Sequence, residues 1–186
     1  MKKIIANQTD MLRTLDRMAH QILENYSDTS NLCLIGVKTR GVYLANRLQE
    51  RIKKFAGITL PVGVLDITWY RDDLSKVAED PQIKPSSVGF DIKDKNLIVV
   101  DDVLYTGRTV RSALDAITDL GRPRKVELLV MVDRGHREIP VKADYVGREV
   151  ITGDDDIIHV HLVEKDGDDC IVHNMAELVD VAIDYV

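Results

Sequence analysis

The prediction of the fold depends on one stretch, Asn96-Leu97-Ile98-Val99-Val100-Asp101-Asp102-Val103-Leu104-Tyr105-Thr106-Gly107-Arg108-Thr109. Residues 97–100 form a short apolar run, which is typical of a strand buried on both faces of a parallel sheet. Two acids and a turn containing hydroxyl groups and a glycine follow. Ala113, Ala116, Ile117 and Leu120 then recur at helical spacing. The stretch therefore predicts a buried strand, a polar turn and a helix.

The polar part of this stretch has the chemistry of a sugar-phosphate site. Ionised aspartates accept hydrogen bonds, so Asp101 and Asp102 can hold the adjacent hydroxyl groups of a ribose. The backbone N–H groups of residues 106–109 come where a helix begins, which favours a bound phosphate, and Gly107 lets the main chain approach closely. Two acids alone would more readily cap the helix, but the complete order of strand, acids, turn and helix favours the sugar-phosphate site. The sequence contains neither GxGxxG after a strand nor GxxxxGK[ST], which makes a dinucleotide site or a P-loop a poor alternative.

Two further units repeat the pattern of a buried strand followed by a polar turn. Residues 32–37 are an apolar run before the turn 38–41 and a helix to about residue 54, and residues 126–132 are an apolar run before the turn 133–137. Alternating strands and helices predict an α/β fold with a central, mostly parallel sheet flanked by helices. Ligands bind at the carboxyl ends of the strands of such sheets, so we expect the turns 38–41, 101–109 and 133–137 to converge.

The remaining segments give a helix, a strand, a long loop and a hairpin. Apolar residues at helical spacing predict a first helix over residues 11–23. Residues 59–70 predict a strand, and the polar, proline-broken segment 71–87 is a candidate lid, with a surface loop as an equal alternative. Segments 157–163 and 170–172 flank Asp166-Gly167 as in a hairpin, and a helical stretch is expected from there to the C-terminus.

The composition of the chain limits the classes of protein to which it can belong. With 186 residues, 45% hydrophobic content and no apolar run of bilayer length, the chain is expected to form one cytoplasmic domain, residues 1–186. A net charge of −6 gives no general reason to expect nucleic acid, so an RNA site would have to be a local basic surface. Cys33 and Cys170 are too few for a disulfide framework, and His159 and His161 lack a cysteine or carboxylate at metal-site spacing, so we expect no metal site there.

Four motifs resemble those of one family. Segments 35–45, 66–75, 96–109 and 132–140 are similar, in this order, to those of the bacterial bifunctional pyrimidine operon attenuator and uracil phosphoribosyltransferase family, which are type I phosphoribosyltransferases. The likeness covers roughly residues 10–150, and it implies the type I fold with a small β-rich hood.

The resemblance assigns roles to residues of this sequence. It implies that Asp101, Asp102 and Arg40 are catalytic, that Tyr70 and Arg71 belong to a lid, and that the base or nucleotide lies against Arg134 and Ile158. The residues expected to bind phosphoribosyl pyrophosphate (PRPP) come from the first two turns: Thr39, Arg40, Asp101, Asp102, Val103, Leu104, Tyr105, Thr106, Gly107, Arg108 and Thr109.

The implied reaction joins uracil to the ribose of PRPP and gives UMP and pyrophosphate. Mg²⁺ is the expected cofactor, held mainly by PRPP oxygens and water, with Asp101 and Asp102 as indirect metal residues. The expected partners are PRPP, uracil, UMP or UTP, the messenger RNA leader of the pyrimidine operon for transcription attenuation, and further copies in a homo-oligomer. Two alternatives stay open: an enzyme without RNA regulation, and a purine-type phosphoribosyltransferase.

The candidate RNA-binding residues are basic and lie in two parts of the sequence: Arg17, His20, His136, Arg137, Lys142 and Arg148. Such groups can contact phosphates and splayed bases, although scattered surface charges are the simpler interpretation of composition alone. Two departures from the family count against RNA. Asp16 replaces a neutral hydroxyl residue, and Asp154, Asp155 and Asp156 put negative charge where relatives are rich in Lys and Ser.

Overall fold

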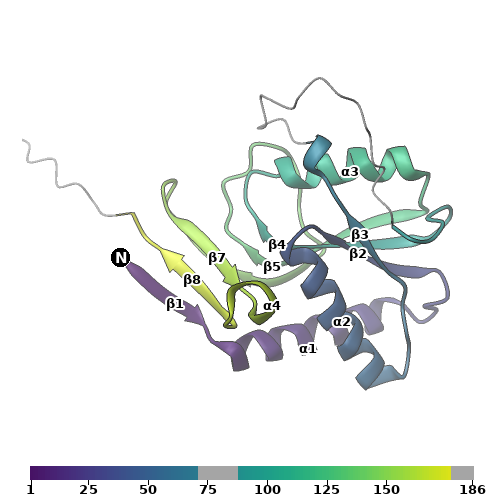
Figure 1. The fold of residues 1–186 in the computed structure, drawn as a ribbon, viewed down its shortest axis with the longest axis horizontal. Coiled ribbons are helices and arrows are strands. Elements are labelled where there is room, and N and C mark those ends of the chain that lie inside the picture. Colours follow the sequence, from purple (N-terminus) through teal and green to yellow (C-terminus); the bar gives the residue numbers. More distant parts are fainter. Residues whose placement is uncertain (71–87, 177–186) are drawn as a thin grey trace, which may run out of the picture.

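A five-stranded parallel sheet forms the centre of the molecule. In the computed structural model, which describes residues 1–70 and 88–176, the strand order is β3-β2-β4-β5-β6 (Figure 1). The strands are β2 (Leu32–Val37), β3 (Val62–Leu65), β4 (Asn96–Leu104), β5 (Lys125–Asp133) and β6 (Tyr145–Glu149). Every adjacent pair is parallel, so the carboxyl ends of all five strands share one edge of the sheet. The predicted α/β fold class is confirmed.

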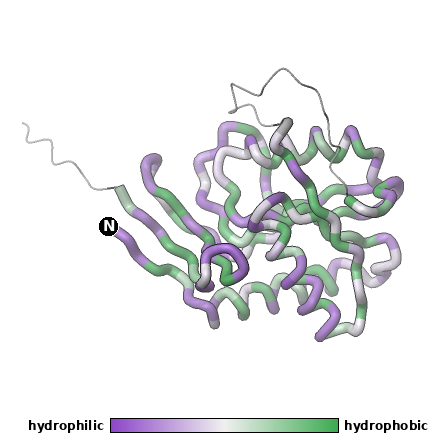
Figure 2. Tube along the Cα trace, in the orientation of Figure 1, coloured by the Kyte–Doolittle hydropathy of each residue, from purple (hydrophilic) through white to green (hydrophobic). Residues whose placement is uncertain are grey.

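Helices cover both faces of this sheet and separate two apolar cores. Helices α1 (Gln8–Asn25) and α2 (Arg40–Ala56) lie on one face, and α3 (Arg108–Leu120) lies on the other (Figure 1). Successive residues of a strand point to opposite faces. Accordingly, Ile98 and Val100 of β4 pack with α1 and α2, whereas Leu97 and Val99 pack with α3. Figure 2 shows apolar residues along the central strands and mixed polar and apolar turns in the helices.

A second, smaller sheet forms the hood. The hood consists of β1 (Lys2–Ala6), β7 (Ile157–His161) and β8 (Cys170–Asn174), together with the short helix α4 (Val163–Asp166). Its strand order is β1-β8-β7 and both pairs are antiparallel. The inner face of the hood adds Ile158, Val160 and Ile171 to the core beneath α1 and α2, and β7 contacts β4. The hood therefore lies beside the edge where β4 ends.

The structure corrects the strand predicted over residues 59–70. Only Val62–Leu65 is a strand, and Thr68–Tyr70 is a 3-10 helix, η1. The carboxylate of Asp66 causes the turn, because it accepts hydrogen bonds from the backbone N–H of Thr68 (3.1 Å) and from its hydroxyl group (2.6 Å). The candidate lid, residues 71–87, and most of the expected C-terminal helix lie outside the described residues. Within the described part, no helix has both the length and the apolar content needed to cross a bilayer.

Candidate active site

Three polar turns meet at the carboxyl edge of the sheet. The turn after β2 lies against β4 so closely that a Cβ atom on Gly41 would stand 2.3 Å from the carbonyl oxygen of Val100. The turn after β5 bonds to the turn after β4, since the N–H groups of Glu138 and Ile139 donate to the carbonyl oxygen of Thr106 at 2.9 and 3.1 Å. Parallel strand topology thus gathers turns that are far apart in sequence.

The paired acids at the end of β4 differ in environment. Asp101 is 8% exposed, and its Oδ1 accepts a hydrogen bond from the N–H of Asp102 at 2.9 Å. Burial, followed by repulsion from Asp102, raises the pKa of Asp101 well above its ordinary value. Asp102 is only half-buried, and its Oδ1 accepts from the N–H of Val103 at 2.9 Å. Of the two, Asp102 therefore has the accessible carboxylate that a sugar diol requires, whereas Asp101 favours its neutral form.

The turn after Leu104, the last residue of β4, leads directly into helix α3. Gly107 is the residue before the helix and has φ of 92°, a conformation that glycine adopts without strain. A Cβ atom there would stand 3.3 Å from Cβ of Ile139, so the residue is also confined by its surroundings. The N–H groups of the first turn of a helix lack intrahelical acceptors and attract anions. Residues 106–109 consequently provide an anion-binding terminus beside the acids.

Arg40 bonds to the hood. Its Nη2 and Nε donate to the two carboxylate oxygens of Asp166 at 2.6 and 3.1 Å. The hydrogen bond with Asp166 is the main cause that raises the pKa of Arg40; burial opposes it, and attraction to Asp102 adds to it. Arg40 thus lies between a hood carboxylate and the acids of β4, while Thr39 beside it is exposed. The sequence does not indicate Asp166 as the partner of Arg40, because no local pattern links two residues 126 positions apart.

Arg134 and Ile158 line one pocket of about 410 Å³, together with Val103, Tyr105, Ile157 and residues 154–156. The guanidinium group of Arg134 lies 3.9 Å from the centre of the Tyr105 ring. Its two terminal nitrogens donate to the carbonyl oxygens of Asp156 (2.6 Å) and Gly153 (3.0 Å). Arg134 is 6% exposed, so it forms a fixed wall of this pocket.

The rim of this pocket continues into a larger hollow of about 530 Å³. His136 faces acceptors with both ring nitrogens: the carbonyl oxygen of Thr152 at 2.7 Å and the carboxylate of Asp154 at 2.8 Å. Arg137 pairs with Asp133 and donates to the carbonyl oxygen of Tyr105 at 2.7 Å. Both predicted RNA contacts therefore make internal bonds that hold the rim together.

The other candidate RNA residues lie in different parts of the fold. Arg17 on α1 donates to the carbonyl oxygen of Gly147 in β6 at 2.5 Å, next to Arg148. His20 stacks on Phe55 with 4.3 Å between ring centres. Lys142 is exposed and lies in the loop before β6. The structure thus places Arg17 beside β6.

The acidic departures from the family differ in their partners. Asp16 pairs with Arg51 at 3.4 Å, and Asp156 accepts from the ring of His173 at 2.8 Å. Asp154 pairs with His136, whereas Asp155 is exposed. Asp16 is therefore balanced by a cation, whereas the histidines beside Asp154 and Asp156 would offset the charge of these acids only when protonated.

Of the predicted lid residues, only Tyr70 lies in the described part. Its hydroxyl group donates to Asp119 of α3 at 2.6 Å, and its carbonyl oxygen accepts from Ser112 at 2.9 Å. Tyr70 is therefore anchored to α3. Arg71 lies outside the described residues, as does the remainder of the candidate lid.

Comparisons with known proteins agree on one family. The family model described as "Phosphoribosyl transferase domain" matches residues 1–165. "Bifunctional protein PyrR" of Elusimicrobium minutum is 55% identical over 92% of this chain and 96% of the relative. The protein of the same name from Oceanobacillus iheyensis is 53% identical over 90% of this chain and 94% of the relative.

Solved structures show the same fold at low identity. The hypoxanthine phosphoribosyltransferase of Trypanosoma cruzi has a TM-score of 0.71 at 17% identity, with 94% of this chain and 97% of that chain covered. A hypoxanthine phosphoribosyltransferase from Staphylococcus aureus has a TM-score of 0.69 at 17% identity, with 94% of this chain and 92% of that chain covered. These likenesses concern the fold alone, and they do not indicate which base this chain uses.

Proposed function

Because the chain belongs to the phosphoribosyltransferase family, within the group of proteins named bifunctional protein PyrR, we propose that it makes UMP and pyrophosphate from uracil and PRPP. One observation carries this proposal. Asp102, which is half-buried, lies near the carboxyl end of the central strand β4, and the amide-lined terminus of α3 begins only a few residues later. A ribose 5-phosphate carries hydroxyl groups that the carboxylate can hold and a phosphate that the helix terminus can hold.

In the proposed reaction, a ring nitrogen of uracil forms a bond to the anomeric carbon while the bond from that carbon to pyrophosphate breaks. The proton of the ring nitrogen passes to solvent. Positive charge grows on the ribose as in glycoside chemistry, and the carboxylate of Asp102 stabilises it. Thr106–Thr109 hold the 5-phosphate, and Arg40 offsets charge on the departing pyrophosphate. Arg40 can do so only by leaving or sharing its bond with Asp166.

Mg²⁺ is part of the proposal, and the donors at this edge fit it. The carboxylate oxygens of Asp102 are hard ligands of the kind that Mg²⁺ prefers. Because Mg²⁺ keeps several waters and binds through substrate phosphates, we expect the accessible Asp102 to hold it. The buried Asp101 would act only indirectly. When bound, the ion would supply charge neutralisation at the pyrophosphate.

We assign the base to the pocket of Arg134 and Ile158. The pocket volume of about 410 Å³ lies in the range of small-molecule sites, and Ile158 offers an apolar cover for a planar ring. Purine-type enzymes share the fold of this chain but only 17% of its sequence, whereas the relatives named PyrR share about half. This difference in identity favours uracil over hypoxanthine.

A base-substrate screen with PRPP and Mg²⁺ tests the proposed activity. We expect uracil to be converted to UMP, and Asp102→Asn to lower kcat/KM by about 100-fold or more, because the ribose charge loses its carboxylate. Asp115→Asn on the exposed side of α3 is the matched control and should leave the rate unchanged. Turnover of hypoxanthine without turnover of uracil would overturn the base assignment, and undiminished activity of Asp102→Asn would overturn the site.

We further propose that the chain binds the leader RNA of the pyrimidine operon and promotes attenuation. The word "bifunctional" in the names of relatives at 55% and 53% identity supports a second role, and the basic surface of Arg17 and Arg148 is its candidate contact. Filter binding to the leader of the organism's own pyrimidine operon tests it, with and without UMP or UTP. Absence of binding at low salt would leave the enzyme alone. A cytoplasmic location and a homo-oligomeric state complete the proposal.

A further inference from the structure

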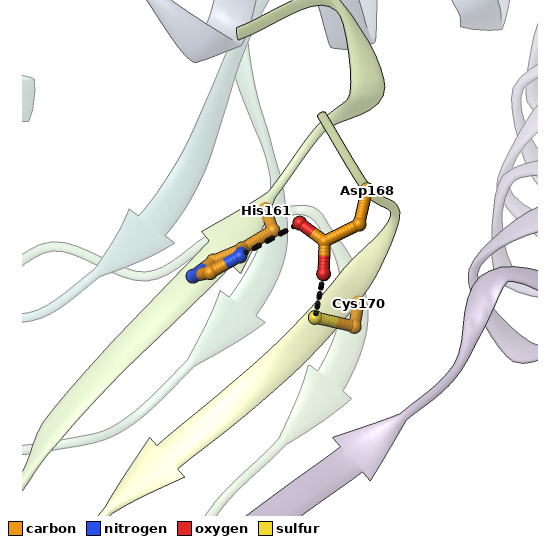
Figure 3. A group of neighbouring side chains, drawn as sticks. All are labelled: His161, Asp168 and Cys170. Atoms are coloured by element: carbon orange, nitrogen blue, oxygen red, sulfur yellow. Dashed lines mark hydrogen bonds and ion pairs between the residues drawn. The ribbon is translucent and has the colours of Figure 1, made fainter. Parts of the chain in front are cut away.

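The outward face of the hood carries a histidine and a cysteine opposite each other. His161 in β7 and Cys170 in β8 are direct partners in the antiparallel register. Directly opposed residues of an antiparallel pair project from the same face with their Cβ atoms about 4.5–5.5 Å apart. The hairpin backbone therefore fixes an imidazole and a thiol side by side, as Figure 3 shows.

Asp168 joins this pair from the connection between α4 and β8. Its Oδ1 lies 3.0 Å from Nδ1 of His161, and its Oδ2 accepts a hydrogen bond from the thiol of Cys170 at 3.3 Å (Figure 3). One ligand atom from each of the three residues lies within 4.8 Å of the others. The sequence predicts no metal site at His159 and His161, because no cysteine or carboxylate has metal-site spacing to them. In the fold, strand pairing brings Cys170 beside His161, and the connection before β8 adds Asp168.

We propose that His161, Asp168 and Cys170 form a Zn²⁺ site outside the proposed catalytic centre. The donor set of imidazole, carboxylate and thiolate is the one that Zn²⁺ takes, and the hard ion Mg²⁺ avoids the sulfur ligand. Zinc bonds of about 2.0–2.3 Å place tetrahedral ligand atoms roughly 3.3–3.8 Å apart, so small side-chain shifts suffice here. Three protein ligands leave the fourth position to water.

Charge and access also suit a divalent cation. A carboxylate and a thiolate balance the charge of Zn²⁺, and the thiol proton passes to solvent when the metal binds. The side chain of Asp168 is 59% exposed and that of His161 is 28% exposed, so an ion can enter from solvent. Cys170 is buried behind them, which gives the site an inner, dry side.

The position of the site suggests what the ion does. Asp166 and Asp169, on either side of the loop that carries Asp168, hold Arg40 and Arg47 of α2. A metal bridging β7, β8 and this loop would fix the segment on which the partner of Arg40 lies. The proposed role is therefore to stabilise the hood, and it does not depend on the identity of the base.

Calorimetric titration of the untagged, chelator-treated full chain with Zn²⁺ tests the site. We expect one Zn²⁺ per chain. Because loss of a second-shell partner already weakens metal binding by about 10–100-fold, His161→Gln, Asp168→Asn and Cys170→Ser should each weaken it at least about tenfold. His20→Gln, an exposed histidine on α1, is the matched control and should bind as the wild type does. Mg²⁺ in excess should not displace the zinc.

Cobalt(II) provides a second readout that identifies the sulfur ligand. Wild-type protein loaded with Co²⁺ should show a thiolate-to-metal charge-transfer band, and Cys170→Ser should lose it. If Cys170→Ser fails to fold, Asp168→Asn decides alone, because its carboxylate is exposed and its replacement leaves the core intact. Zinc binding that survives in Asp168→Asn, or a cobalt complex without the charge-transfer band, would overturn the proposal and leave a hydrogen-bonded trio.

Discussion

Asp101 is a residue whose burial costs stability. Its pKa is raised by burial and by Asp102, so the folded state holds this proton more tightly than the unfolded state, whose value is near 3.8. The stabilising effect of the proton is complete below that value and is lost as pH rises towards the folded pKa. The chain therefore tolerates an unfavourable acid at the edge where we place the ribose, as is common at functional sites.

The substitution Asp101→Asn should consequently raise Tm at neutral pH. Asparagine keeps the oxygen that accepts from the N–H of Asp102 and has no charge to bury. We expect the gain to shrink as pH falls towards 4, with about 2–4 °C for each kcal/mol recovered in a chain of this size. Thermal melts of both proteins from pH 4 to pH 8 measure it. A variant that is less stable than the wild type at pH 8 would show that the carboxylate is favourably held.

At the level of single residues, the sequence predicted where a residue lies in the fold better than which residue it bonds to. Asp101, Asp102 and the turn to Thr109 could be placed at the sheet edge because an apolar strand precedes them. The bond from Arg40 to Asp166 could not be predicted, because the hood brings a carboxylate from a distant segment. The same holds for Asp168 and Cys170 beside His161.

At the level of elements, helix α2 is tied to the hood by arginine. Arg47 donates to Glu164 (2.5 and 2.8 Å) and to Asp169 (2.7 and 3.1 Å), and the side chain of Asp169 is only 5% exposed. Burial works to raise the pKa of Asp169, but hydrogen bonds from Arg47 and from the N–H of Val163 lower it overall. This contribution to stability is present above the ordinary carboxyl pKa and is lost on acidification.

Arg47→Gln should therefore destabilise the fold strongly. It leaves Asp169 buried without its cation, and removal of one partner of a buried pair costs about 3–5 kcal/mol. We expect about 3 kcal/mol, because Glu164 is a third exposed, and hence a Tm lower by about 6–12 °C at pH 7. Lys53→Gln on the exposed side of the same helix is the control. Equal melting of Arg47→Gln and wild type at pH 7 would mean that the hood is held by apolar contacts alone.

The elements found and missed by sequence differ in burial. Strands β2 and β4 are nearly continuous buried runs, and β5 is buried over most of its length, so their apolar patterns identified them. Strand β1 has mostly exposed residues and begins with two lysines, and β6 is a partly exposed edge strand containing Gly147. Such strands form by pairing with distant partners, and no local alternation of apolar and polar residues predicts them.

At the level of the whole molecule, the net charge of −6 limits how RNA can be bound. Phosphate contacts must come from a few cations, because the surface as a whole repels a polyanion. Among the candidates, Arg17, Lys142 and Arg148 are the exposed cations, whereas Arg137 is held in its pair with Asp133. With so few phosphate contacts, the affinity for RNA should fall only moderately as the salt concentration rises.

We expect the binding constant for single-stranded leader RNA to fall with salt at a log–log slope of about −2, since three phosphate contacts contribute about −0.7 each. Between 50 and 200 mM salt this is a loss of about 15-fold. Arg17→Gln should weaken binding and make the slope shallower by somewhat less than one unit. Arg124→Gln, an exposed arginine just before β5, is the matched control and should change neither value. If both variants reduce the slope equally, the RNA is held by diffuse charge, and the surface of α1 and β6 is not its site.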